Sequence, residues 1–115
     1  MEDQEKIKVL MFCALGMSSS LLAARATDAA KAAGIELEMV LLSAAEVAIY
    51  DFAANPVDMV LIAPQVRFKK RSITQAAAPH GIPVEDIEPV TYGMVDGQAL
   101  FEQIRRAVKP KGAGV

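Results

Sequence analysis

Residues 6–20 read KIKVLMFCALGMSSS, and they carry the strongest indication of the fold. Residues 6–12 form a nearly continuous apolar run of the kind that fills a parallel strand covered on both faces. Cys13 ends this run, and a loop rich in glycine and serine follows it. An alanine- and leucine-rich segment of strong helix formers then extends to Ala33, with Gly34 as its stop signal. The stretch therefore predicts a strand, a loop and a helix in succession.

The same alternation continues along the chain. We expect further strands at residues 36–42, 58–63 and 84–87, and helices at residues 44–54, at residues 68–78 and after an N-cap at Asp96. Short connections between alternating strands and helices require right-handed crossovers. The sequence thus predicts an α/β fold of three layers with phosphatase-like or flavodoxin-like topology, in which helices cover both faces of a parallel sheet of about four strands, ordered 2-1-3-4. We expect one domain over residues 1–109 and a disordered tail over residues 110–115.

The composition excludes several classes of function. The chain has 115 residues, 53% of them hydrophobic, and a net charge of −2, so it offers no bulk attraction for nucleic acid or anionic lipid. Its single cysteine and single histidine can form neither an internal disulfide nor a tetrahedral zinc site, which indicates a reducing cytosol. No apolar run approaches the length of a membrane span. We expect a cytoplasmic protein without metal, cofactor, nucleic-acid partner or direct membrane insertion.

Cys13 is the residue that the predicted fold singles out for chemistry. Ligands of such sheets bind beyond the carboxyl ends of the strands, beside the first strand, and Cys13 lies there. It precedes a helix amino terminus, where free N–H groups and the helix dipole favour a negative charge and hence a thiolate. The same N–H groups can cradle a phosphate, with glycine allowing close approach and serines adding hydroxyl donors. The phosphate-binding loop predicted in this way comprises Ala14, Leu15, Gly16, Met17, Ser18, Ser19 and Ser20.

Other polar residues fall near the same edge of the predicted sheet. Gln65 and Tyr92 are candidates for support of the loop or for contact with a partner, although a turn-capping role is the ordinary interpretation of each. A basic run follows the third strand and lies where it can assist the docking of an acidic partner. The run consists of Arg67, Lys69, Lys70 and Arg71. His80 is predicted at the opposite end of the sheet, too far from Cys13 to act as its base.

Three motifs in the same order resemble those of one protein family. Residues 12–22, FCALGMSSSLL, resemble the phosphorylation loop of the lactose/cellobiose IIB components of the bacterial phosphoenolpyruvate-dependent sugar phosphotransferase system, whose usual form is close to C-x-x-G-M-S-T-S-L-L. Residues 61–66, LIAPQV, resemble the family's L-L-G-P-Q-V, with Ala63 in place of the usual glycine. Residues 92–97, YGMVDG, resemble its Y-G-x-x-D-G before the last helix.

The resemblance implies a phosphoryl carrier. Cys13 would accept a phosphoryl group from a phosphohistidine of a IIA protein and pass it to a sugar bound by the membrane IIC component, which makes the chain a phosphotransferase component with a phosphocysteine intermediate. Its expected location is the cytoplasm, with transient association with the inner face of the membrane through IIC. The sequence leaves lactose, cellobiose and chitobiose all open as the sugar.

Two alternative functions remain. A low-molecular-weight phosphatase or arsenate reductase also has a cysteine before an anion-binding loop, but its C-x5-R motif requires an arginine where this chain has Ser19. A flavodoxin-like module has a similar phosphate loop, but a flavin favours flanking aromatic side chains, and this chain has no tryptophan and only Tyr92 at the predicted edge. A receiver domain would need an aspartate where Ala63 and Pro64 stand, and a thiol-disulfide carrier a second cysteine.

Overall fold

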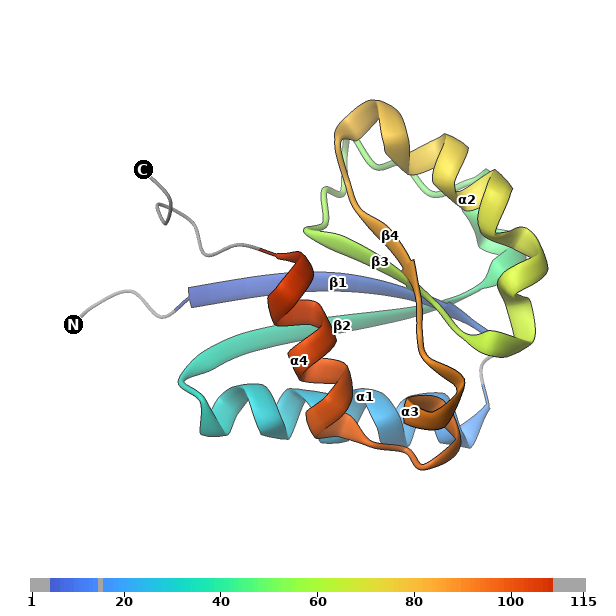
Figure 1. Ribbon diagram of the computed structural model, residues 1–115. Coiled ribbons are helices and arrows are strands. Elements are labelled where there is room, and N and C mark those ends of the chain that lie inside the picture. The colour runs from blue at the N-terminus through green and yellow to red at the C-terminus, as the bar shows by residue number, and fades with distance from the viewer. Residues whose placement is uncertain (1–4, 15, 109–115) are drawn as a thin grey trace.

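The computed structural model describes residues 5–14 and 16–108, so the tail expected at residues 110–115 lies outside the described part. Four strands form one parallel sheet in the order β2-β1-β3-β4 (Figure 1). The strands are β1 (Glu5–Cys13), β2 (Ile35–Ser43), β3 (Met59–Ile62) and β4 (Val84–Asp86). The predicted α/β class and the predicted strand order are both confirmed.

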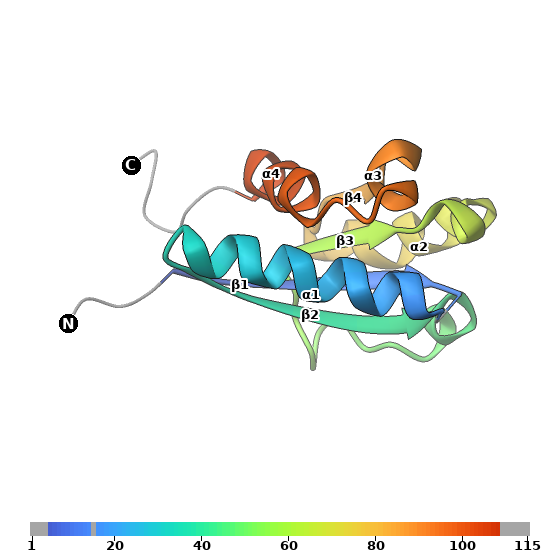
Figure 2. The same ribbon diagram turned by 90° about the horizontal axis from the view of Figure 1, so that it is seen from below.

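Helices cover the sheet on both faces. The α-helices are α1 (Met17–Ala32), α2 (Lys70–Ala77), the short α3 (Pro89–Gly93) and α4 (Gly97–Ala107), and the 3-10 helices are η1 (Ala44–Ala48), η2 (Pro64–Lys69) and η3 (Ala78–His80). In Figures 1 and 2 α1 and α4 lie side by side, and these two helices pack on each other while α1 also packs on β2. Because crossovers between parallel strands are right-handed, α2 and η1 cover the opposite face.

The core lies where the central strands are covered on both sides. Residues 9–13 of β1 and residues 59–62 of β3 have no solvent exposure at all. A strand that alternates its side chains between two faces can be buried throughout only if both faces are covered. The continuous apolar run therefore predicted the central strand correctly.

One predicted helix is wrong. Residues 44–54 form only the 3-10 helix η1, after which the chain turns. The carboxylate of Asp51 accepts hydrogen bonds from the backbone N–H groups of Ala53 and Ala54, both at 3.0 Å. A side chain that binds nearby N–H groups in this way competes with the hydrogen bonds of a helix. The helix expected over residues 68–78 likewise begins later, because η2 precedes it and α2 starts at Lys70.

The last helix begins at a cap and packs closely on the first. The carboxylate of Asp96 accepts a hydrogen bond of 3.0 Å from the N–H of Ala99, which confirms Asp96 as the predicted N-cap. Gly97 follows, and a Cβ atom at this position would collide with the α1 backbone at Arg25 and Ala26. Glycine therefore allows α4 to approach α1 at this crossing.

Candidate functional site

Cys13 is the last residue of β1 and lies at the carboxyl-terminal edge of the sheet. It pairs in register with Ser43 at the end of β2. Its side chain is fully buried, and Sγ lies 3.9 Å from the backbone carbonyl oxygen of Leu42, which makes at most a weak S–H hydrogen bond. The thiol therefore stands at the switch point of the sheet, where β1 is flanked by β2 and β3.

The segment after Cys13 leads directly into the amino terminus of α1. Gly16 is the N-cap residue in an extended conformation, and no side chain caps this helix. The carbonyl oxygen of Gly16 accepts hydrogen bonds from the N–H groups of Ser19 and Ser20 at 3.2 and 3.4 Å. The first N–H groups of a helix have no acceptor four residues earlier within the helix. This end of α1 thus offers N–H donors and a positive dipole end beside the cysteine.

Most residues of the predicted phosphate-binding loop are exposed to solvent. Ala14, Gly16, Met17, Ser18 and Ser20 are exposed at this edge, and Leu15 lies outside the described residues. A Cβ atom at Gly16 would meet no atom within 4 Å, so the space over this residue is open. Gly16 therefore leaves its side of the helix terminus uncovered by other side chains.

Ser19 differs from the other loop serines because its side chain points inward. Its hydroxyl oxygen is buried and lies 2.7 Å from the hydroxyl oxygen of Tyr92, which belongs to α3. This contact joins the first turn of α1 to α3, and the two residues are far apart in the sequence. Sequence reasoning named both residues but did not predict that they meet, and it did not predict α3. The Pro89 at the first position of α3 was the available signal for that helix.

The other residues predicted for this edge come from the segment after β3. Gln65 is exposed in η2, as is Arg67. A hollow of about 180 Å³ lies beside them, lined by Pro64, Arg67, Asp86, Ile87, Glu88 and Pro89. Lys70 of the basic run forms a salt bridge of 3.0 Å with Asp86, and both side chains are about half exposed. The basic run thus begins next to the cysteine edge and ends at the start of α2.

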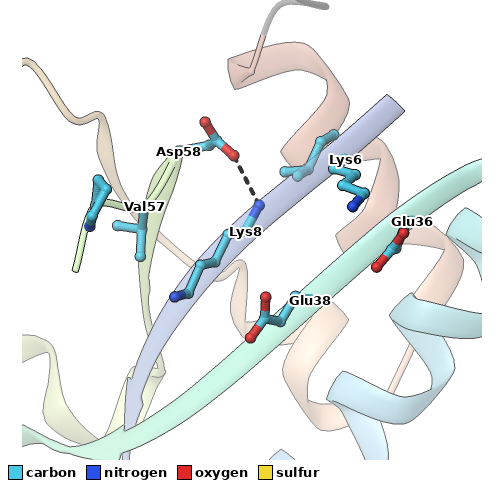
Figure 3. Close-up of a pocket in the computed structure, with 8 residues that line it drawn as sticks. Lys6, Lys8, Glu36, Glu38, Val57 and Asp58 are labelled. Carbon is cyan, nitrogen blue, oxygen red and sulfur yellow. Dashed lines mark hydrogen bonds between the residues drawn. The ribbon is translucent and has the colours of Figure 1, made fainter. Parts of the chain in front are cut away.

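The opposite end of the sheet carries a larger hollow of about 350 Å³ (Figure 3). It lies over the start of β1 and β2, on the face away from α1, where Lys6 and Lys8 pair in register with Glu36 and Glu38. Cys13 comes five positions after Lys8 in β1, and at about 3.3 Å per residue the hollow is on the order of 16 Å from the thiol. Asp58 accepts a hydrogen bond of 2.8 Å from the Lys8 backbone N–H there.

His80 also belongs to the end of the molecule away from the thiol. It is exposed, ends η3 and precedes β4, so it is near the amino-terminal edge of the sheet. Its ring lies 5.8 Å from that of Phe52, measured between centroids. Cys13 and His80 are therefore at opposite ends of the strands, and no cysteine–histidine pair forms.

The fold and the site place the chain among small α/β proteins that have a cysteine at the end of the first strand, directly before a helix amino terminus. Within this class, residues 8–103 match the family model described as "PTS system, Lactose/Cellobiose specific IIB subunit". The chain belongs to this family, so it is a sugar-specific IIB component of the phosphotransferase system.

Characterised relatives span nearly the whole chain. The oligo-beta-mannoside-specific EIIB component of Bacillus subtilis is 36% identical over 99 residues, which cover 84% of this chain and 90% of the relative. The galactose-specific and cellobiose-specific EIIB components of two Lactococcus lactis subspecies are each 32% identical over 95 residues, covering 81% of this chain and 88% of each relative.

Solved structures show the same architecture. The cellobiose-specific IIB component of Borrelia burgdorferi superposes with a TM-score of 0.68 at 29% identity, covering 90% of this chain and 92% of the other. The lactose-specific IIB domain of Streptococcus pneumoniae gives a TM-score of 0.74 at 20% identity, covering 91% of this chain and all of the other, and this second likeness concerns the fold alone. Among residues 5–14 and 16–108, no helix is long and apolar enough to cross a membrane.

Proposed function

We propose that Cys13 is the phosphoryl acceptor of this IIB component. A phosphohistidine of a IIA protein donates the group: the bond between phosphorus and the histidine nitrogen breaks, a bond between phosphorus and Sγ forms, and the proton lost from the thiol ends on the departing histidine nitrogen. In the second step the bond to Sγ breaks, the phosphoryl group passes to a hydroxyl oxygen of a sugar held by the membrane IIC component, and the proton lost by that hydroxyl restores the thiol of Cys13.

The observation that carries this proposal is the position of Cys13 directly before the amino terminus of α1. A phosphoryl group on Sγ brings a charge of about −2 at neutral pH. The proposed donors that stabilise it are the backbone N–H groups of the segment from Ala14 to Ser18, together with the dipole of α1. The exposed hydroxyls of Ser18 and Ser20 are further candidates, whereas the hydroxyl of Ser19 is occupied by Tyr92.

A carrier must hold its phosphoryl group until the next partner binds. A phosphatase that uses a cysteine loop stabilises the transferring group with a fixed arginine, which contributes several kcal/mol to the transition state. The position of that arginine is Ser19 in this chain, and its side chain is directed to Tyr92. Absence of the arginine favours a carrier over a hydrolase.

The proposal includes the setting in which the carrier operates. Residues 1–109 act as one phosphocarrier domain in the cytoplasm, and the domain reaches the inner face of the membrane only through IIC. The relatives are named for oligo-β-mannosides, galactose and cellobiose at similar identities to this chain. We therefore leave the sugar of this chain unnamed and assign its recognition to IIC.

Intact-mass measurement tests the proposal. The protein is incubated with phosphoenolpyruvate, the general phosphotransferase proteins and a lactose/cellobiose-type IIA protein of the same organism. The expected result is an added mass of roughly 80 Da, one phosphoryl group, in the wild type and in His80→Ala, and no added mass in Cys13→Ser. If Cys13→Ser gains the same mass at a comparable rate, or if the group is found on His80, the proposal is wrong.

A further inference from the structure

Large apolar side chains that are exposed to solvent gather around the cysteine edge. Met17, Ile49, Phe68, Val90 and Met94 are 71% to 87% exposed, and we call these five residues the apolar rim. Met17 follows β1, Ile49 follows β2, Phe68 follows β3, and Val90 and Met94 follow β4. The only other exposed large apolar residue in the part of the chain that the structure describes is Leu21, in the second turn of α1.

The position of the apolar rim follows from the topology. All four strands are parallel, so the segments that follow them lie at the same edge of the sheet as Cys13. Both views of the molecule show the start of α1, the end of β1, η2 and α3 together at this edge (Figures 1 and 2). Isolated surface apolar residues are ordinary, but a group of them gathered on one surface marks an interaction site.

The shape of this edge fits a protein better than a sugar. The hollow beside it measures about 180 Å³, which is below the several hundred cubic ångströms of a typical small-molecule site. Its exposed apolar residues come from the four separate segments that follow the four strands. A partner surface can cover all of them at once, whereas a ligand in the small hollow cannot.

Charges on the Phe68 side indicate what kind of protein binds. Arg67 and Lys69 flank Phe68, and Arg71 follows in α2. In the described part of the chain, none of these three cations has an ion-pair partner within 4 Å, unlike Lys70. Glu88 contributes one exposed carboxylate on the Val90 side. A partner protein with an acidic surface would complement the positive charges beside Phe68. A phosphohistidine on that partner would add further negative charge.

From these observations we infer that the apolar rim, with Arg67 and Lys69 beside it, is the docking surface for the phosphorylated IIA protein. The inference rests on the proposed function, because it is the phosphohistidine of IIA that must reach Cys13. Phe68 and Met94 are its central apolar contacts. Arg67 and Lys69 attract the negative charge of the phosphohistidine.

Steady-state phosphoryl transfer tests the docking surface. Lactose/cellobiose-type IIA proteins of the same organism are charged with phosphate, and one that phosphorylates wild-type Cys13 is chosen as the donor. If none of them phosphorylates Cys13, the proposed function fails, independently of the docking surface. With the chosen donor, the initial rate is measured against the concentration of phospho-IIA, which separates KM from kcat.

The variants remove apolar area or reverse charge without touching the core. We expect Phe68→Ser with Met94→Ser to raise the KM for phospho-IIA about tenfold at nearly unchanged kcat, because central apolar contacts carry much of the affinity of an interface. Arg67→Glu should raise KM by a similar factor at low salt and by less at high salt, because salt screens exposed charges. Phe68→Leu, which keeps an apolar side chain, should restore most of the affinity.

The matched controls lie away from the cysteine edge. Arg106→Glu changes an exposed arginine near the end of α4, and Ala32→Ser changes an exposed residue at the end of α1. Both should leave KM within about twofold of wild type, as near-neutral surface changes do. If the Phe68 and Met94 double variant also stays within twofold while its urea unfolding is unchanged, the inference is wrong. If that variant loses only transfer to the sugar through IIC, the surface serves the acceptor and the inference is again wrong.

Discussion

Removing the hydroxyl group of Tyr92 should cost stability through its partner Ser19. The two hydroxyl oxygens are 2.7 Å apart, and both side chains are buried, with 0% exposure at Ser19 and 9% at Tyr92. In Tyr92→Phe, the Ser19 hydroxyl loses this partner in a position that water does not reach. Leaving a buried polar group without its hydrogen bond costs about 1–3 kcal/mol.

The companion variants isolate the hydrogen bond itself. Ser19→Ala should cost less than Tyr92→Phe, because alanine has the higher helix propensity by roughly 0.5 kcal/mol in the first turn of α1. In the double variant both polar groups are gone, and such a replacement is nearly neutral compared with leaving one of them unpaired. The double variant should therefore be more stable than the sum of the single losses predicts, by about 1 kcal/mol.

Urea unfolding of the reduced protein measures these differences. With a slope of about 1–3 kcal/mol per molar urea, the midpoint of Tyr92→Phe should fall on the order of 1 M at unchanged slope. Tyr50→Phe is a matched control, because the Tyr50 hydroxyl donates a hydrogen bond of 2.7 Å to the Asn55 carbonyl at an exposed site. It should cost less than about 0.5 kcal/mol. Strictly additive losses at Ser19 and Tyr92 would refute the argument, and so would a Tyr92→Phe midpoint equal to that of wild type.

Two further outcomes follow from particular contacts. Gly97→Ala should lower the free energy of unfolding by about 1–3 kcal/mol, because the added Cβ meets the α1 backbone and forces α4 away from it. Urea unfolding measures this loss, and a stability equal to that of the wild type would contradict the close approach of the two helices. Partial burial of the Tyr50 side chain raises its pKa above the usual value of 10.0, and the nearby carboxylate of Glu38 raises it further. The folded protein then holds a proton that the unfolded chain releases above about pH 10, so the free energy of unfolding should fall as pH rises through this range. Tyr50→Phe should make that fall shallower, and equal slopes in the two proteins would count against the raised pKa.

Much of the fold could be predicted from short sequence patterns, such as apolar runs and helix caps. The apolar run over residues 6–12 needs cover on both faces, and this requirement already implies a central strand with helices on two sides. Asp96 predicts the start of α4 because its carboxylate accepts a hydrogen bond from within the next turn. Cys13 could be placed at the binding edge for a similar reason, since the end of the first strand of a parallel sheet has a fixed location.

The remaining features depend on contacts between distant parts of the chain. The sequence around residues 44–54 is compatible with a helix, but the hydrogen bonds of Asp51 to its neighbours compete with one, and propensity does not reveal that outcome. Ser19 and Tyr92 each suggest an ordinary turn or cap, and only the packing of α3 on α1 brings their hydroxyls together. The apolar rim is likewise a set of unremarkable single residues until the parallel topology gathers them at one edge. The order of the four strands, the first helix and the last helix could be predicted from the sequence, because short local stretches encode them, and Cys13 could be predicted as the candidate nucleophile. The burial of Ser19 against Tyr92 and the exposure of the apolar rim could not be predicted in this way, because both depend on the approach of segments far apart in the chain.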